Sequence, residues 1–152
     1  MNSSIHFHSE CISFALKQKK QAKNWIKTIA ESFKKEIDFI NFIFCSDNYL
    51  KEINHKHLNH NYFTDIVTFN YNSENKISGD LFLSIDRIRE NAKTYQVTFE
   101  EELHRVMCHG ILHLIGFNDK TASEQKIMRE KENFCLSLKN FNTVSRETFK
   151  EK

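Results

Sequence analysis

Two histidines four residues apart lie inside an apolar stretch of the chain, and their spacing suits the binding of one metal ion. On a helix, His109 and His113 share a face about one turn apart, so both rings can reach the same ion. Gly116 suits the left-handed residue that ends a helix, and a chain that reverses there can return Asp119 as a third ligand. Two histidines, a carboxylate and an open coordination position are the features of hydrolytic zinc sites.

The same histidines have an ordinary structural alternative. A histidine on an apolar helix face is usually a core residue with a hydrogen-bond partner, because leaving a buried ring unpaired costs about 1–3 kcal/mol. The glycine break and the acid after it favour the metal site without excluding the core role. Gly110 stands where a zinc peptidase of the HExxH type has its glutamate, which argues against that class of enzyme.

The helix that would position the histidines is marked at its start and along one face. Thr98 is expected as the N-cap, with Glu101 completing a capping box. Apolar residues at helical spacing then form a stripe that faces a core, namely Leu103, Met107, Ile111 and Leu114. Both histidines lie to one side of this stripe.

The remaining patterns predict an α+β fold, with a mixed sheet of about four strands and five or so packed helices. Strands are expected within residues 5–14, 37–45, 64–71 and 79–85, and the last two are expected to be antiparallel neighbours. Further helices are expected from 17 to 33, 47 to 57, 86 to 95 and 121 to 138. The predicted buried positions of the last two helices are Ile88, Ala92, Tyr95, Ile127, Met128, Phe134, Cys135 and Leu138.

Length and composition bound the class of protein. A chain of 152 residues with 39% hydrophobic residues is expected to form one domain, over residues 1–144, followed by a polar tail at 145–152. The net charge of +2 gives no overall basic character, so any RNA groove must be local. The four cysteines form no CxxC pair and lie in apolar segments, which indicates buried thiols in a reducing compartment. No signal or membrane-spanning pattern is present, so a cytoplasmic location is expected.

Several other polar residues are weaker candidates. His6 and His8 alternate along the first strand, where an exposed strand face is the favoured interpretation. The lysines at 17, 19, 20 and 23 favour a solvated helix face over contact with RNA phosphates. His104 and Arg105 precede the metal motif by one turn, and surface salt bridging is favoured over phosphate binding.

Three ordered motifs resemble those of the YbeY-type endoribonucleases. The segment HGILHLIGFND, residues 109–119, is similar to the family signature HGxLHLxGYDH. Residues 64–69, TDIVTF, resemble the family's TDVLSF segment, and residues 79–84, GDLFLS, resemble its GDIFIS segment. The resemblance covers about residues 40–135.

The resemblance implies a metal-dependent, single-strand-specific endoribonuclease that matures the 3′ end of 16S ribosomal RNA, with possible partners among small-subunit proteins. It places His109, His113 and Asp119 on the three metal ligands, with Zn²⁺ as the expected ion and another divalent transition metal as the alternative. Asp119 replaces the third histidine of the family pattern, which supplies a harder ligand. Leu58 falls at the position of a family arginine thought to bind phosphate, and His60 or nearby lysines could take its place.

Several questions stay open from the sequence. Asp65 and Asp80 sit at strand ends, where each is either a carboxylate that orients a metal histidine or an ordinary turn or capping residue. Besides the nuclease, a metal hydrolase of another substrate and a non-catalytic ribosome assembly factor with a structural metal fit the motifs. A fourth protein ligand would favour the assembly factor, whereas an open cleft would favour an enzyme. The general base and the oligomeric state are not assigned.

Overall fold

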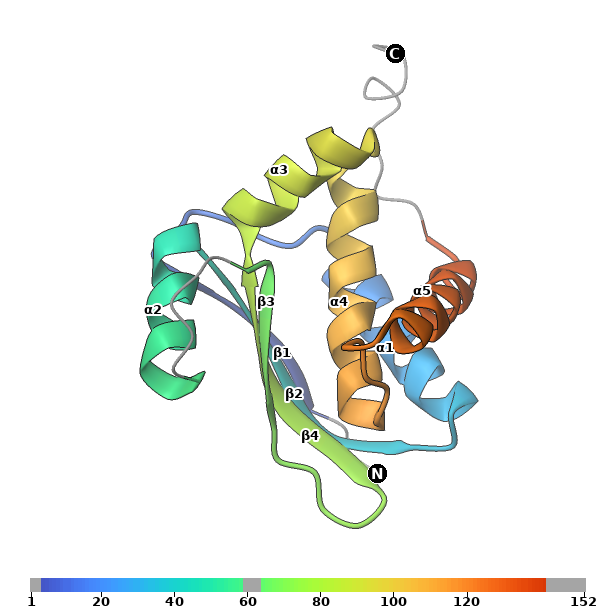
Figure 1. Ribbon diagram of the computed structural model, residues 1–152. Coiled ribbons are helices and arrows are strands. Elements are labelled where there is room, and N and C mark those ends of the chain that lie inside the picture. Colours follow the sequence, from blue (N-terminus) through green and yellow to red (C-terminus); the bar gives the residue numbers. More distant parts are fainter. Residues whose placement is uncertain (1–3, 59–63, 142–152) are drawn as a thin grey trace.

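The protein is built on a four-stranded mixed sheet, described in a computed structural model over residues 4–58 and 64–141 (Figure 1). The strand order is β1 (Ser4–Glu10), β2 (Glu36–Cys45), β4 (Lys76–Ser84) and β3 (Ile66–Asn70). The first three strands are parallel, and β3 is antiparallel to β4. The predicted α+β class and the antiparallel neighbours are therefore confirmed. β3 forms one edge of the sheet.

Helices cover both faces of the sheet. α1 (Lys19–Ser32), α4 (Phe99–Ile115) and α5 (Ala122–Ser137) lie on one side, α2 (Asp47–Leu58) lies on the other, and α3 (Ile85–Tyr95) packs at one end (Figure 1). The nearly continuous apolar sequence of β2 follows from this arrangement, because a central strand covered on both faces buries side chains in both directions.

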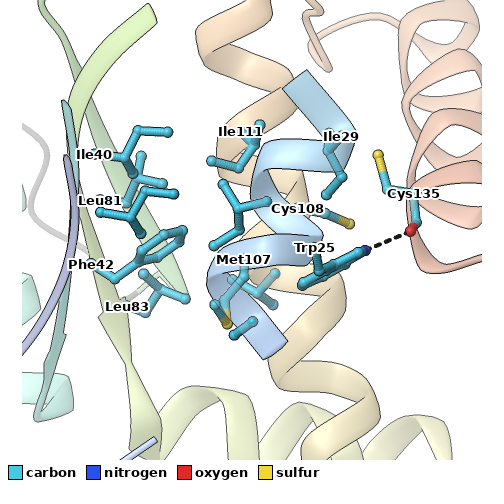
Figure 2. Packing of buried hydrophobic residues seen from close by; sticks show 14 of the residues in the cluster. Trp25, Ile29, Ile40, Phe42, Leu81, Leu83, Met107, Cys108, Ile111 and Cys135 are labelled. Carbon is cyan, nitrogen blue, oxygen red and sulfur yellow. Dashed lines mark hydrogen bonds between the residues drawn. The ribbon is translucent and has the colours of Figure 1, made fainter. Parts of the chain in front are cut away.

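The main core lies between the sheet and α4 (Figure 2). All four residues of the predicted helix stripe are buried there. A Cβ on Gly110 would stand 2.8 Å from Ile66 Cδ1 and 3.1 Å from Leu81 Cδ1, so the glycine lets the histidine-bearing helix lie close against the sheet. The Trp25 indole donates a 2.8 Å hydrogen bond to the Cys135 carbonyl, which ties α1 to α5.

Hydroxyl side chains define where the last three helices begin. Ser84, Thr98 and Thr121 each accept a hydrogen bond from a backbone N–H three residues later. At Thr121 the Glu124 carboxylate also accepts from the Thr121 N–H, which completes a capping box. At Thr98 only the predicted N-cap bond forms, without the return bond from the Glu101 carboxylate that the predicted capping box requires. These bonds fix the start of α4 and of α5, the two helices that frame the metal motif.

Some predicted burial is wrong. Ile127 and Phe134 are 45% and 42% exposed, because α5 turns the neighbouring positions Met128 and Cys135 inward. Tyr95 is 57% exposed, since α3 buries Ile88 and Ala92 and ends at Tyr95. Of the four cysteines, Cys11 is exposed and the other three are buried, all as free thiols.

Two further predictions concern the C-terminal tail and membrane-spanning segments. The tail predicted at 145–152 lies outside the described residues, so the domain boundary stays a prediction. Among the residues described, no helix is long and apolar enough to cross a bilayer.

Candidate metal centre

The structure brings His109, His113 and Asp119 together at the C-terminal end of α4. The two histidine Nε2 atoms are 3.1 Å apart, and Asp119 Oδ2 lies 3.1 Å from His109 Nε2 and 3.3 Å from His113 Nε2. The side chain of His109 is 20% exposed, that of His113 is 27% exposed and that of Asp119 is 36% exposed. They therefore form a small triangle of ligand atoms that solvent can reach.

A turn at Gly116 ends α4 and brings Asp119 back beside the two histidines. Gly116 has φ 127°, its N–H donates to the His113 carbonyl, and the Phe117 N–H donates to the Leu112 carbonyl. This pattern is a Schellman motif, which reverses the chain at a helix end. The Gln125 side chain then holds the returning loop by a 3.2 Å hydrogen bond to the Asp119 carbonyl.

Glu132 of α5 orients the first histidine. Its Oε2 accepts a 2.6 Å hydrogen bond from His109 Nδ1, which leaves His109 Nε2 facing the triangle. Glu132 is 7% exposed, and its other oxygen accepts a 2.9 Å bond from Arg105. A carboxylate that fixes the tautomer and direction of a metal histidine is a common feature of metal sites. Glu132 was not among the residues predicted for the site.

The charges around the triangle act in opposite directions on the two rings. Burial alone would lower the pKa of His109, but the hydrogen bond and charge of Glu132, with Asp119 and Asp65, raise it above its usual value. Burial and the neighbouring His109 lower the pKa of His113, against the opposing effect of Asp119. The hydrogen bonds from His109 and Arg105 outweigh burial and lower the pKa of Glu132. His113 is therefore the ring that most readily stays neutral, the state that binds metals.

The triangle has the dimensions of a tetrahedral zinc site. Ligand atoms about 2.0–2.1 Å from a tetrahedral ion stand about 3.3 Å from one another. The three measured separations, 3.1, 3.1 and 3.3 Å, come close to this edge length. Within the described ranges, the candidate cluster holds no fourth histidine, cysteine or acidic ligand. Such a set would leave one coordination position open.

Two cavities meet at the triangle. A cavity of about 420 Å³ runs between α4 and α5 and is called the α5 cavity here. A second cavity of about 520 Å³ runs toward the edge strand β3 and is called the β3 cavity. Both are lined by Asp65, His109 and Asp119. The ligand triangle therefore lies where two open cavities join.

The other candidate residues divide between this region and distant parts of the fold. Asp65 lines both cavities, and burial raises its pKa although the nearby His109 opposes the shift. Asp80 accepts a hydrogen bond from Asn41 and lies in the middle of β4, next to Phe82 of the cluster on the α2 side, so it does not serve His109 or His113. Leu58 is 40% exposed and lines the β3 cavity together with Lys120, while His60 lies outside the described residues.

The predictions for Arg105 and His104, which are neighbours on α4, have different outcomes. Arg105 forms an ion pair as predicted, but its partner is the buried Glu132, so the pair does not lie on the surface. The surface role predicted for His104 is wrong, because its ring is 1% exposed and packs between Trp25 and Phe141, with Lys139 Nζ 2.7 Å from its Nδ1. His6 and His8 are exposed on β1, at the opposite edge of the sheet from β3, as expected.

The family pattern extends over nearly the whole described chain. The model of the family Endoribonuclease YbeY matches residues 4–140. The chain belongs to this family. Endoribonuclease YbeY of Parabacteroides distasonis is 48% identical over 134 residues, which cover 88% of this chain and 94% of that protein. The YbeY protein of Cytophaga hutchinsonii is 48% identical over 139 residues, or 90% and 96% of the two chains.

A solved structure extends the comparison to the fold. A Thermotoga maritima protein determined in solution superposes with a TM-score of 0.62 at 28% identity, covering 88% of this chain and 87% of that one. The motif resemblance seen in the sequence is thus confirmed at the level of the YbeY family and of its fold.

Proposed function

We propose that this YbeY family member is a metal-dependent endoribonuclease that cleaves single-stranded RNA, and that it matures the 3′ end of 16S ribosomal RNA in the cytoplasm. The proposal is carried by one observation. His109, His113 and Asp119 place three ligand atoms at zinc-like separations where two open cavities join. The names of the curated relatives support RNA as the substrate.

The residues present fit a zinc ion better than a hard cation. Two imidazoles and one carboxylate are a ligand set found in catalytic zinc sites, whereas Mg²⁺ and Ca²⁺ favour sites made of oxygen ligands. When bound, such an ion supplies Lewis-acid polarisation of a phosphoryl oxygen and activation of water. Another divalent transition metal would suit the same atoms.

The protein's own side chains have separate tasks in this proposal. His109, His113 and Asp119 would hold the ion, and Glu132 keeps the His109 ring turned toward it through the 2.6 Å hydrogen bond. Lys120 lines the β3 cavity next to Asp119 and is placed to attract a phosphate, a task for which the family pattern has an arginine at the position of Leu58. Asp65, which lines both cavities, is an additional carboxyl available for proton transfer.

The joined cavities favour a single strand as substrate. An unpaired strand can bend through the groove and place one phosphate at the triangle, with neighbouring nucleotides in the α5 and β3 cavities. The open position also favours an enzyme over an assembly factor that uses the ion for structure alone, since structural zinc sites are closed by four protein ligands. Small-subunit ribosomal proteins remain proposed partners.

The test pairs metal content with RNA cleavage. Bound metal is measured by elemental analysis, and cleavage is followed on a single-stranded RNA and on the same sequence in a duplex. The wild type is expected to bind zinc and to cut the single strand. His113→Ala is expected to lose both, while His6→Ala, the same change at an exposed site on the far edge of the sheet, keeps both.

Three outcomes would overturn the proposal in different ways. Zinc retained by the wild type without cleavage of any RNA would favour the assembly factor. Cleavage that His113→Ala leaves intact would remove the triangle from the active site, and turnover of another phosphodiester in place of RNA would favour a different hydrolase.

A further inference from the structure

The α5 cavity contains a buried carboxyl that the proposed reaction does not use. Glu102 is on α4, two turns before His109, and is 5% exposed, yet its side chain lines the cavity. Across residues 4–58 and 64–141, no donor forms a hydrogen bond to the Glu102 carboxyl. Neither Glu102 oxygen is a fully buried unpaired atom, so the carboxyl is open to the cavity, where a ligand can supply the donor that the described protein groups do not.

The other walls of the cavity suit a flat, nitrogen-rich group. Val106 and Met128 are buried and give the cavity an apolar surface, while Tyr95 stands at its edge, 57% exposed. An exposed tyrosine beside an apolar wall is a platform on which a nucleobase can stack. The cavity of about 420 Å³ has room for one base with its ribose.

Charge argues against a phosphate in this position. Four carboxyls line the cavity against two cations, and both cations, Arg105 and Arg129, pair with the same carboxyl, Glu132. Burial, followed by the charge of Asp65, raises the pKa of Glu102 to about 7. A phosphate anion would be repelled there, whereas a neutral base with N–H donors would satisfy the carboxyl.

The position of Glu102 along α4 sets its distance from the ligand triangle. Seven residues of helix span about 10 Å, so Glu102 lies too far from His109 to act on the phosphate at the triangle but about one nucleotide away from it. Resting on the function proposed above, we propose that the α5 cavity is a subsite for one unpaired nucleobase beside the cleaved phosphate. The Glu102 carboxyl accepts a hydrogen bond from the base's exocyclic amino group, and Tyr95 stacks on its face.

This arrangement selects among the four bases. Adenine, cytosine and guanine have an exocyclic amino group, whereas uracil presents a carbonyl oxygen at the corresponding position. Above the pKa of Glu102 the carboxylate can only accept, so uracil would face it as a second acceptor. Cytosine and uracil have the same size and differ at this edge, so they form the matched pair for a test. A carboxyl that accepts from the cytosine amino group is expected to discriminate between them by about tenfold.

The experiment uses the zinc-loaded full chain and an oligouridine RNA with or without a single cytidine. We expect the wild type to cut beside the cytidine about tenfold faster than at the uridine positions. Glu102→Gln removes this preference, because an amide can donate to uracil as well as accept from cytosine. Glu101→Gln, which removes the same charge from the first turn of α4 outside the cavity, keeps it.

A second variant tests the subsite independently, in case Glu102→Gln does not fold. Tyr95→Ala changes an exposed residue, and it is expected to weaken binding of both RNAs alike, by between about five- and 150-fold, through the lost stacking.

Three results would contradict the subsite or separate it from the nuclease. Uniform cleavage of both RNAs by the wild type would overturn the subsite and leave the nuclease intact. Unchanged RNA binding by Tyr95→Ala would also overturn it. If the zinc-loaded protein cut no RNA, the proposed nuclease function would be wrong, and binding of the same two RNAs would be measured by fluorescence anisotropy. Tighter binding of the cytidine RNA would support the subsite, and equal binding of both RNAs would overturn it.

Discussion

Replacing Glu132 is expected to weaken zinc binding although Glu132 is not a proposed ligand. Its carboxylate holds His109 Nδ1 at 2.6 Å and is itself 7% exposed, so it acts on the ring where water screens little of its charge. Loss of a carboxylate that orients a metal histidine typically lowers metal affinity 10–100-fold, or about 1.4–2.7 kcal/mol. Glu132→Gln keeps an oxygen acceptor and loses the charge, so it should fall at the lower end of this range.

Glu132→Ala should fall at the upper end. It removes the acceptor as well, leaves Arg105 without its carboxylate and frees the His109 ring to rotate. The control is Glu130→Gln, which removes an equal charge from the exposed side of α5. Zinc dissociation constants are measured by competition with a chromophoric chelator at one pH. The order expected is wild type and Glu130→Gln tightest, then Glu132→Gln, then Glu132→Ala.

One result would refute this reasoning. If all four proteins bound zinc with the same affinity, the contact between Glu132 and His109 would be a structural ion pair with no effect on the ligand. If both Glu132 variants lost zinc together with their fold, melting curves of the metal-free proteins would reveal it, and the affinity comparison would be repeated on Glu132→Gln at a temperature where it is folded.

Four further predictions concern the ligands, the turn, the buried histidine and the coupling of metal to α5. Asp119→His should retain zinc while Asp119→Ala binds it at least about tenfold more weakly, and equal affinities in the same chelator assay would remove Asp119 from the site. Gly116→Ala should lower the free energy of unfolding by about 1–3 kcal/mol because φ is 127° there, which urea titration measures; an unchanged midpoint would refute the strain. Burial and Lys139 lower the pKa of His104 to about 3, so below pH 6.5 the unfolded chain binds a proton that the folded chain does not. The free energy of unfolding should therefore decrease as the pH is lowered, by up to about 1.4 kcal/mol per pH unit. His104→Gln should show a smaller decrease between pH 6.5 and 5. Zinc should slow hydrogen exchange in α5 more than in β1, and equal protection of both would contradict the link between the ion and α5.

The features that the sequence revealed are those set by neighbours along the chain. His109 and His113 meet because four residues make one helical turn, and Asp119 returns because Gly116 can adopt a positive φ. The pairing of β3 with β4 follows from two β-rich segments joined by a short polar loop. None of these inferences needed the packing of distant elements.

The features that were missed depend on how helices pack against one another. Glu132 reaches His109 only because α5 lies against α4, and 23 residues separate the two in sequence. A signal was nevertheless present, since Glu132 stands at helical spacing between Met128 and Cys135, and a charged residue in a buried stripe needs a partner. Ile127 and Phe134 are apolar but exposed, so the apolar pattern of α5 is broader than its buried stripe and does not single out position 132.

The same packing explains why binding of an ion and docking of α5 belong to one equilibrium. Asp119 lies on the loop that α5 holds through Gln125 and the Thr121 cap, and His109 is turned by Glu132 of the same helix. Separating α5 from α4 would therefore disturb two of the three proposed ligands, while His113 would keep its place on α4. An ion that binds only the docked arrangement must stabilise that docking by its differential binding free energy. The local motif supplies the ligand atoms, and the non-local contact of α5 decides whether they converge.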